Sequence, residues 1–314
     1  MADLVNSFSL SNSQIENFLS CPRKYWFGRY GSWGGWEKTA PERTREIYRL
    51  KNLSNVYLWT GDRVHSTIRT IVETFLEKGL VLDKENVKEN LSKQFDTEFA
   101  QSKDSYDPKT FDKKSFRLIE HDDPKKAFDE DRLNDVLCRA LRCIDGFYAS
   151  DIARFIFDKK VEVVRKDDVL ESYSLPIGRT DIPYVPVYIT IDLLLKNPAT
   201  GNYLVVDWKT GKPSKTHNDQ LALYALFVSD KFKVPAEKIK IAPLYLAYTP
   251  DTLDLTTVTA KDVETEKNSL IYHSNEILQL IDDPVKGIAN EERFSKKPTR
   301  FGCSNCVYER VCAH

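Results

Sequence analysis

Residues 203–211, Tyr-Leu-Val-Val-Asp-Trp-Lys-Thr-Gly, begin with an apolar run of β-forming residues that ends in an acid and a base two positions apart. Successive side chains of a β-strand point to opposite faces, so Asp207 and Lys209 share one face while Val206 and Trp208 take the other. The pattern therefore predicts a strand with a buried apolar start and a polar end that carries an acid and a base. The Thr-Gly pair that follows closes the strand.

A second apolar run, at residues 188–195, contains a single acid, Asp192. The turn-forming residues 197–202, Asn-Pro-Ala-Thr-Gly-Asn, separate this run from the next strand, so the two are predicted to pair as a hairpin. Such a hairpin would bring Asp192 beside Asp207. A carboxylate inside so apolar a strand is costly unless it is paired or binds a cation.

Apolar residues at helical spacing predict helices at residues 8–20, 61–77, 131–149, about 217–229 and 261–282. The first of these is expected to begin with a capping box formed by Ser13 and Glu16. Further strands are predicted at 161–164, 239–248 and 256–259. The glycine-rich and basic residues 28–60 predict loops, and the polar residues 83–130 predict a helical insertion.

This order of elements predicts an α/β fold in which helices flank a mixed central sheet. The expected parts are an N-terminal helix with a basic loop region (1–60), a helical region with a charged insertion (61–155), a core that holds the strands (156–260), and a C-terminal helix with a cysteine-rich tail (261–314). At 314 residues the chain is long enough for these parts to fold as one cooperative domain.

Composition is that of an ordinary globular protein, with 41% hydrophobic and 30% charged residues. The net charge of −1 gives no global basic field toward nucleic acid, although a local basic track would suffice for binding it. The sequence has no apolar run of membrane-spanning length and no signal-peptide pattern, which predicts a cytosolic protein without membrane contact. In that reducing compartment, six cysteines favour metal binding over disulfides.

The acid and base at the end of the 203–211 strand suit metal-assisted hydrolysis of a phosphate ester. Asp207 would hold a divalent cation, and Lys209 would orient or activate the water that attacks phosphorus. Taken alone, an Asp-x-Lys pair is more often a surface ion pair. Asp192 across the hairpin, together with Gln220 and Tyr224 four residues apart on the following helix, shifts the interpretation toward a catalytic site.

These residues resemble the motifs of the PD-(D/E)XK nuclease superfamily, specifically its RecB/AddB-like branch, which includes the iron–sulfur nucleases of CRISPR adaptation. In that branch a histidine precedes the acids, and Gly61-Asp62-Arg63-Val64-His65 resembles that element. The resemblance covers both ends of the chain and its core. It does not extend to the region from about residue 80 to about residue 155. It implies a restriction-endonuclease-like fold and metal-dependent DNA cleavage.

The resemblance also implies roles for individual residues. Mg²⁺ or Mn²⁺ would be held by two acids, a backbone carbonyl and an imidazole: Asp192, Asp207, Trp208 and His65. Gln220 and Tyr224 would orient the lysine or the phosphate. An imidazole suits manganese better than magnesium. Without this context, a lone histidine at the edge of an apolar helix stripe is more often a packing residue.

The identity of the first metal-binding acid is open to an alternative. Family members usually have a glycine three residues before that acid, and Gly178 and Asp181 have this spacing, whereas Asp192 has Ile189 there. We nevertheless predict Asp192. Asp181 begins an Asp-Ile-Pro loop and lies too far from Asp207 along the chain for a tight hairpin.

Four cysteines have the arrangement found in the iron–sulfur members of that branch: Cys21, Cys303, Cys306 and Cys312. The resemblance implies a [4Fe–4S] cluster that ties the two ends of the chain together. Thiolate chemistry alone also permits Zn²⁺, for which His314 is an alternative ligand. Cys138 and Cys143 lie roughly 140° apart on the predicted helix 131–149 and are interpreted as packing cysteines.

The segment Arg23-Lys24-Tyr25 is basic and aromatic, and it either contacts a DNA strand by charge and stacking or lies partly in the core beside the cysteines. The predicted function is that of a metal-dependent DNA nuclease, a single-stranded DNA exonuclease in repair and recombination or in antiviral, CRISPR-like DNA processing. Its expected partners are DNA ends and other proteins of such a complex. The alternative is a non-catalytic DNA-end-binding or scaffold subunit that keeps a structural iron–sulfur cluster.

Overall fold

The computed structural model describes residues 4–104, 116–127, 130–166, 170–212, 218–248 and 255–312, and the side chains of residues 130, 165, 166 and 218–220 lie outside this description. The strands are β1 (Leu10–Ser11), β2 (Glu162–Lys166), β3 (Glu171–Pro176), β4 (Tyr184–Ile189), β5 (Leu193–Lys196), β6 (Tyr203–Lys209), β7 (Ile239–Tyr245) and β8 (Thr256–Thr257).

The longer helices are α1 (Asn12–Ser20), α3 (Glu42–Lys51), α4 (Val56–Lys78), α5 (Lys84–Lys103), α7 (Glu130–Ala149), α8 (Asp151–Phe157), α9 (Asn218–Phe232) and α10 (Ala260–Leu278). The shorter ones are α2 (Pro22–Trp26), α6 (Ile119–Asp122), α11 (Arg300–Ser304) and α12 (Glu309–Cys312). The segment η1 (Phe27–Gly31) is a short π-helix. The described 3-10 helices are η3 (Pro124–Lys126), η5 (Ala236–Lys238), η6 (Leu246–Tyr248) and η7 (Glu291–Arg293). None of the described helices is both long and apolar enough to cross a membrane.

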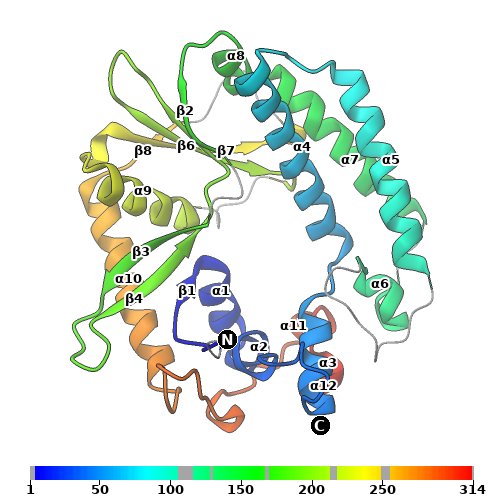
Figure 1. Cartoon of the computed structure of the whole chain (residues 1–314), viewed down its shortest axis with the longest axis vertical. Helices are drawn as coiled ribbons and strands as arrows, with labels where there is room; N and C mark the ends of the chain where they lie inside the picture. Colours follow the sequence, from blue (N-terminus) through cyan, green and yellow to red (C-terminus); the bar gives the residue numbers. More distant parts are fainter. Residues whose placement is uncertain are drawn as a thin grey trace.

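Two sheets organise the described part of the chain (Figure 1). The larger has the strand order β2-β5-β6-β7-β8 and is mixed, because β5 and β6 pair antiparallel while β6 and β7 pair parallel. The smaller has the order β1-β4-β3, with β1 parallel to β4. Parallel neighbours need a long crossover, and α9 supplies it between β6 and β7. The predicted α/β fold with a mixed sheet flanked by helices is confirmed.

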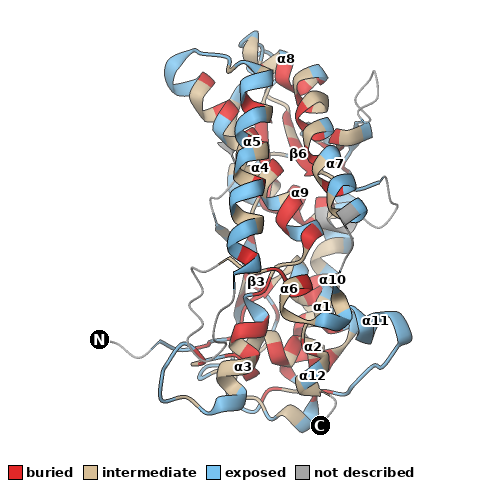
Figure 2. Ribbon diagram, turned by 90° about the vertical axis from the view of Figure 1, so that its right-hand side faces the viewer, coloured by how far each residue is buried: buried red, intermediate tan, exposed pale blue. Residues whose placement is uncertain are grey.

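The two faces of β6 pack into different cores. Val205 belongs to a cluster with apolar residues of α9 and α10, whereas Val206 and Trp208 belong to a cluster with α4, α5 and α7. The Trp208 ring meets the Phe147 ring of α7 edge-on, with centroids 5.7 Å apart. Figure 2 shows buried positions running through β6 and α9 and exposed ones over the outside of α5. The alternation predicted for residues 203–211 is therefore confirmed.

Both ends of the chain lie at the same end of the molecule, where α1–α3 meet α11 and α12 (Figure 1). Arg23 forms an ion pair with Glu291 of the tail at 2.8 Å. Asp122 of α6 contacts Arg49 of α3 and Arg310 of α12, each at 2.6 Å. Contacts other than those of the cysteines therefore join the tail to the N-terminal region.

Residues 188–195 do not form the single strand that their apolar character predicts. The chain leaves β4 at Ile189 and enters β5 at Leu193, and these strands belong to different sheets. Asp192 lies in the short link between them. The acid therefore interrupts the apolar run at the point where the chain changes sheet.

Two predictions for the N-terminal region are also corrected. Residues 28–60 contain the regular helix α3, because Ile47 is buried against the aromatic residues of η1 and the tail while Arg43 and Lys51 stay exposed. The first helix is capped by Ser11, whose hydroxyl accepts a hydrogen bond from Gln14 N–H, and not by Ser13.

Candidate active site

The polar end of β6 carries a close ion pair. Lys209 Nζ lies 2.6 Å from Asp207 Oδ2, which confirms that the two side chains share a face of the strand. Asp207 is only 2% exposed, and its Oδ2 atom makes no well-directed hydrogen bond among the described residues. The carboxylate therefore keeps unused acceptor capacity in a buried position.

Asp192 lies across the hairpin from Asp207. β5 and β6 pair antiparallel with Leu193 opposite Val206, so the predicted hairpin is confirmed and the residue before Leu193 faces Asp207. Asp192 Oδ2 accepts a hydrogen bond from the Trp208 backbone N–H at 2.7 Å. Asp192 lies just before β5 begins, so its side chain can accept from the Trp208 N–H of β6, a donor that a neighbouring strand would otherwise use in the sheet.

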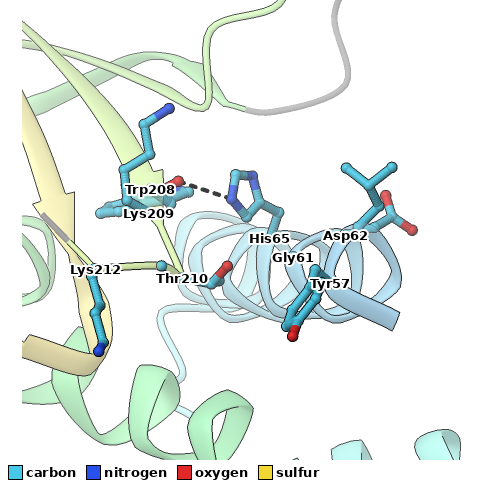
Figure 3. Close-up of a pocket in the computed structure, with 10 residues that line it drawn as sticks. Tyr57, Gly61, Asp62, His65, Trp208, Lys209, Thr210 and Lys212 are labelled. Atoms are coloured by element: carbon cyan, nitrogen blue, oxygen red, sulfur yellow. Dashed lines mark hydrogen bonds between the residues drawn. The ribbon is translucent and has the colours of Figure 1, made fainter. Parts of the chain in front are cut away.

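Helix α4 brings His65 to the two acids. Its Nδ1 atom lies 3.3 Å from Asp192 Oδ1. Its Nε2 atom lies 3.0 Å from the Trp208 carbonyl oxygen, the contact that is dashed in Figure 3. Val64 and Ile68 bury the apolar stripe of α4 against the sheet and leave His65 at the edge of that stripe. Both ring nitrogens face oxygen acceptors, whereas a neutral imidazole has one N–H to donate.

The electrostatics of the site centre on Asp207. Burial and the charge of Asp192 raise the pKa of Asp207 to about 6, against the opposing effects of Lys209 and His65. Two nearby carboxylates in a low-dielectric environment disfavour each other's ionisation. A divalent cation between them would reverse that effect.

A cavity of about 550 Å³ opens beside these groups (Figure 3). One wall comes from the first half of α4, and the other from the end of β6 and the turn that follows. The lining residues are Tyr57, Leu58, Gly61, Asp62, His65, Trp208, Lys209, Thr210, Gly211 and Lys212. The cavity thus joins two segments far apart in sequence around the candidate catalytic groups.

The donor set fits a divalent cation. Asp192, Asp207 and the Trp208 carbonyl offer oxygen ligands, and His65 offers a ring nitrogen. A cation would give the buried Asp207 Oδ2 atom a partner besides Lys209. It would also interact with the two oxygen atoms that face the ring nitrogens of His65, of which a neutral imidazole can serve only one. Within the described residues, no three His, Cys, Asp or Glu side chains are gathered to bind one ion. In this structure Asp192 accepts a hydrogen bond from a backbone N–H, and Asp207 pairs with Lys209.

Three other residues were considered for the site on the basis of the sequence: Asp181, Tyr224 and Gln220. Asp181 is in an exposed loop, paired with Arg179 at 2.6 Å, and does not line the cavity. Tyr224 is buried in the cluster that packs on the Asp207 face of β6, and it does not line the cavity either. The side chain of Gln220 lies outside the described residues. The roles assigned to Tyr224 and Gln220 remain predictions.

The basic and aromatic segment after α1 is largely internal. Arg23 is 6% exposed and Tyr25 is 2% exposed, and the Tyr25 ring stacks on Phe294 with centroids 6.1 Å apart. Their burial favours the alternative in which this segment lies partly in the core, because little of either side chain is exposed. Lys24 is half-buried and lines a second cavity.

That second cavity, of about 690 Å³, brings together the four cysteines predicted to form one site: Cys21, Cys303, Cys306 and Cys312. Burial and the nearby Cys21 and Cys312 raise the pKa of the Cys306 thiol. Among the described residues, neither these cysteines nor any other three His, Cys, Asp or Glu side chains form a group that could hold one metal ion. His314 lies outside the described residues.

The two cysteines of α7 differ from each other. Cys143 is fully buried, and burial raises the pKa of its thiol to about 12, as expected for a packing cysteine. Cys138 is exposed, so its interpretation as a packing cysteine is wrong. Neither lines the cavity of the four other cysteines.

The start of α4 is the part of the site that the sequence analysis missed. The helix begins at Val56, five residues before the predicted start, with Asn55 as its cap. This extension adds Tyr57 and Leu58 to the cavity wall. Asn is a favoured N-cap residue, so Asn55 was the available signal.

The chain matches a known family. A model of the PD-(D/E)XK nuclease superfamily matches residues 9–313, a span that includes the region of about 80–155 that the motif resemblance left out. No curated protein matches the chain.

Proposed function

The chain belongs to the PD-(D/E)XK nuclease superfamily, and on that basis we propose that it is a metal-dependent DNA nuclease that shortens single-stranded ends. Membership of the superfamily implies metal-dependent hydrolysis of phosphodiester bonds. The observation that carries the proposal for this chain is the placement of Asp207 and Lys209 at the end of β6, with Asp192 across the hairpin, beside an open cavity.

Each group at the site has a distinct part in the proposed reaction. Asp192, Asp207, the Trp208 carbonyl and His65 would hold Mg²⁺ or Mn²⁺, which supplies Lewis-acid activation of the phosphate and of the attacking water. The Lys209 ammonium lies at the cavity wall, where it can orient the water and stabilise negative charge that develops on the phosphoryl oxygens. The Trp208–Phe147 contact beneath the strand holds the backbone that carries these groups.

The size of the cavity supports a single-stranded substrate. A volume of about 550 Å³ lies within the range of small-molecule sites, roughly 300–1,000 Å³, and cannot enclose a duplex. An unpaired end supplies nucleotides one at a time to such a site. As part of the same proposal, the family resemblance implies that the protein acts in DNA repair or in antiviral DNA processing. It also implies that the protein works in the cytosol with partner proteins.

We propose further that the four-cysteine cavity holds a [4Fe–4S] cluster. The four thiols line one cavity, which supports a site that they share. Their one-plus-three arrangement along the chain resembles that of the iron–sulfur members of the family, and this resemblance is the reason for proposing a cluster and not zinc. All four thiols are free to bind iron.

The test is degradation of linear and circular single-stranded DNA of the same composition by the purified full chain, with Mg²⁺, with Mn²⁺ and with EDTA. The proposal predicts metal-dependent loss of the linear strand, survival of the circle and no reaction in EDTA. Equal cutting of the circle would contradict the exonuclease assignment. Binding of the strand without cleavage under either metal would favour the scaffold function.

A further inference from the structure

The cavity wall formed by α4 ends in two exposed apolar side chains. Tyr57 is 48% exposed and Leu58 is 65% exposed, although both line the same cavity as His65 and Lys209. An aromatic ring kept half exposed at the mouth of a site offers a flat apolar surface to a ligand. Neither side chain has a part in the proposed chemistry.

The Tyr57 ring is held in place from one side. The Arg132 guanidinium of α7 lies over the ring, 5.0 Å from its centroid, and Arg132 Nε donates to the Tyr57 hydroxyl at 3.1 Å. The buried Glu120 accepts a hydrogen bond from Val56 N–H, next to Tyr57 in the chain, at 3.1 Å and interacts electrostatically with Arg132. The Asn55 side chain accepts a hydrogen bond from Tyr57 N–H at 3.0 Å. A ring fixed in this way loses little conformational entropy when a ligand packs on it.

The position of Tyr57 relates it to the candidate metal site. Tyr57, Gly61 and His65 follow one another at four-residue spacing on one face of α4, so Tyr57 stands about 12 Å from His65 along the helix axis. Gly61 places no side chain between them. Lys212, which is exposed, lies on the opposite wall of the cavity (Figure 3). The α4 wall of the cavity therefore presents the Tyr57 ring and the Asp62 carboxylate, and the opposite wall presents the Lys212 ammonium.

We propose that Tyr57, braced by Arg132, is a stacking platform for an unpaired base of single-stranded DNA, and that the phosphate of the same nucleotide lies toward Lys212. Stacking on an aromatic side chain does not depend on base identity and requires a base that is free of a duplex. This inference rests on the proposed function, which identifies the ligand as DNA. It adds a residue, Tyr57, that would make the site select single strands.

The experiment measures binding of fluorescein-labelled oligo-dT to the full chain in EDTA, where no cleavage occurs, for the wild type, Tyr57→Leu and Tyr57→Phe. An abasic strand of the same length is the second ligand. Tyr184→Leu is the control variant, because Tyr184 is 60% exposed on β4 and does not line the cavity. Thermal melting of each variant verifies folding.

The proposal predicts that Tyr57→Leu raises the Kd for oligo-dT about 5- to 150-fold, with Tyr57→Phe and Tyr184→Leu within about twofold of the wild type. The Tyr57→Leu effect should disappear on the abasic strand, because that strand has no base to stack. An unchanged oligo-dT Kd for folded Tyr57→Leu, or an equal loss on the abasic strand, would overturn it. If the wild type binds DNA through Tyr57 but never cleaves it, the stacking role of Tyr57 is supported and the proposed nuclease activity is contradicted.

Discussion

The Trp208 backbone N–H donates a 2.7 Å hydrogen bond to Asp192 Oδ2, and the carbonyl of the same residue lies 3.0 Å from His65 Nε2. One peptide segment of β6 thus aligns a carboxylate from the neighbouring link and an imidazole from α4. Because the Trp208 ring is anchored in the core against Phe147, the position of both groups is fixed by packing. The candidate ligands come from three separate segments, and β6 is the one that joins them.

This arrangement predicts which acid binds metal. Asp192→Asn should weaken Mn²⁺ binding at least about tenfold, as expected when a group that holds a metal is neutralised. Asp181→Asn should leave the affinity unchanged, because Asp181 is paired with Arg179 in an exposed loop. Isothermal titration calorimetry with Mn²⁺ measures both. A larger loss for the Asp181 variant would show that the first acid has been misassigned.

Lys212 is predicted to contact one phosphate of the bound strand. Lys212→Ala should weaken oligo-dT binding and reduce the slope of log K against log salt by about 0.7, the value expected for one phosphate contact on a single strand. The control is Lys78→Ala, at the exposed far end of α4. Salt titrations by fluorescence anisotropy give the slopes. An unchanged slope for Lys212→Ala would exclude that contact.

The ion-pair cluster at the chain ends predicts a large effect on stability. Asp122→Ala would remove the 2.6 Å partner of Arg49, which is 3% exposed and keeps Glu46 at 2.8 Å. An uncompensated buried charge typically costs about 3–5 kcal/mol of unfolding free energy, so the loss should lie below that range but above the shift from an exposed pair. Urea denaturation measures this loss. Asp282→Ala removes an exposed pair with Arg293 and should shift the midpoint little, so equal shifts would contradict the buried role of Asp122.

The cysteine cavity predicts the iron content of the protein. Wild-type protein purified without oxygen should be brown with about four iron atoms, and Cys21→Ser should lose the iron because one ligand of the cluster is missing. The tail should stay docked in that variant, because Arg23–Glu291 and the Asp122 contacts hold it independently. Cys138→Ser, at an exposed thiol outside the cavity, should keep the full iron content. Colourless wild-type protein with one zinc would refute the cluster.

Much of the candidate site could be predicted because its signals are local. The alternation around Asp207 and Lys209 and the turn at 197–202 require only neighbouring residues, and both predictions are confirmed. The link at Asp192 could not be predicted in the same way. Apolar periodicity is the same whether a chain continues a strand or passes to another sheet.

Other parts depend on contacts between distant residues. Arg23 is buried because Glu291, 268 positions away, pairs with it, and no local pattern reveals that partner. The start of α4 was missed for a different reason, since the exposed Tyr57 and Leu58 break the apolar stripe that marks the rest of the helix. Arg132, which fixes Tyr57, belongs to a separate helix.

The most direct test of the catalytic assignment is the single-turnover rate of single-strand degradation by Asp207→Asn and Lys209→Ala, compared with the wild type and with Asp181→Asn. The account predicts that the first two variants lose several orders of magnitude in rate while they melt close to the wild type. It predicts the wild-type rate for Asp181→Asn, because interactions made in the transition state are removed only in the first two. A wild-type rate in folded Asp207→Asn or Lys209→Ala would contradict the assignment of the active site to the end of β6.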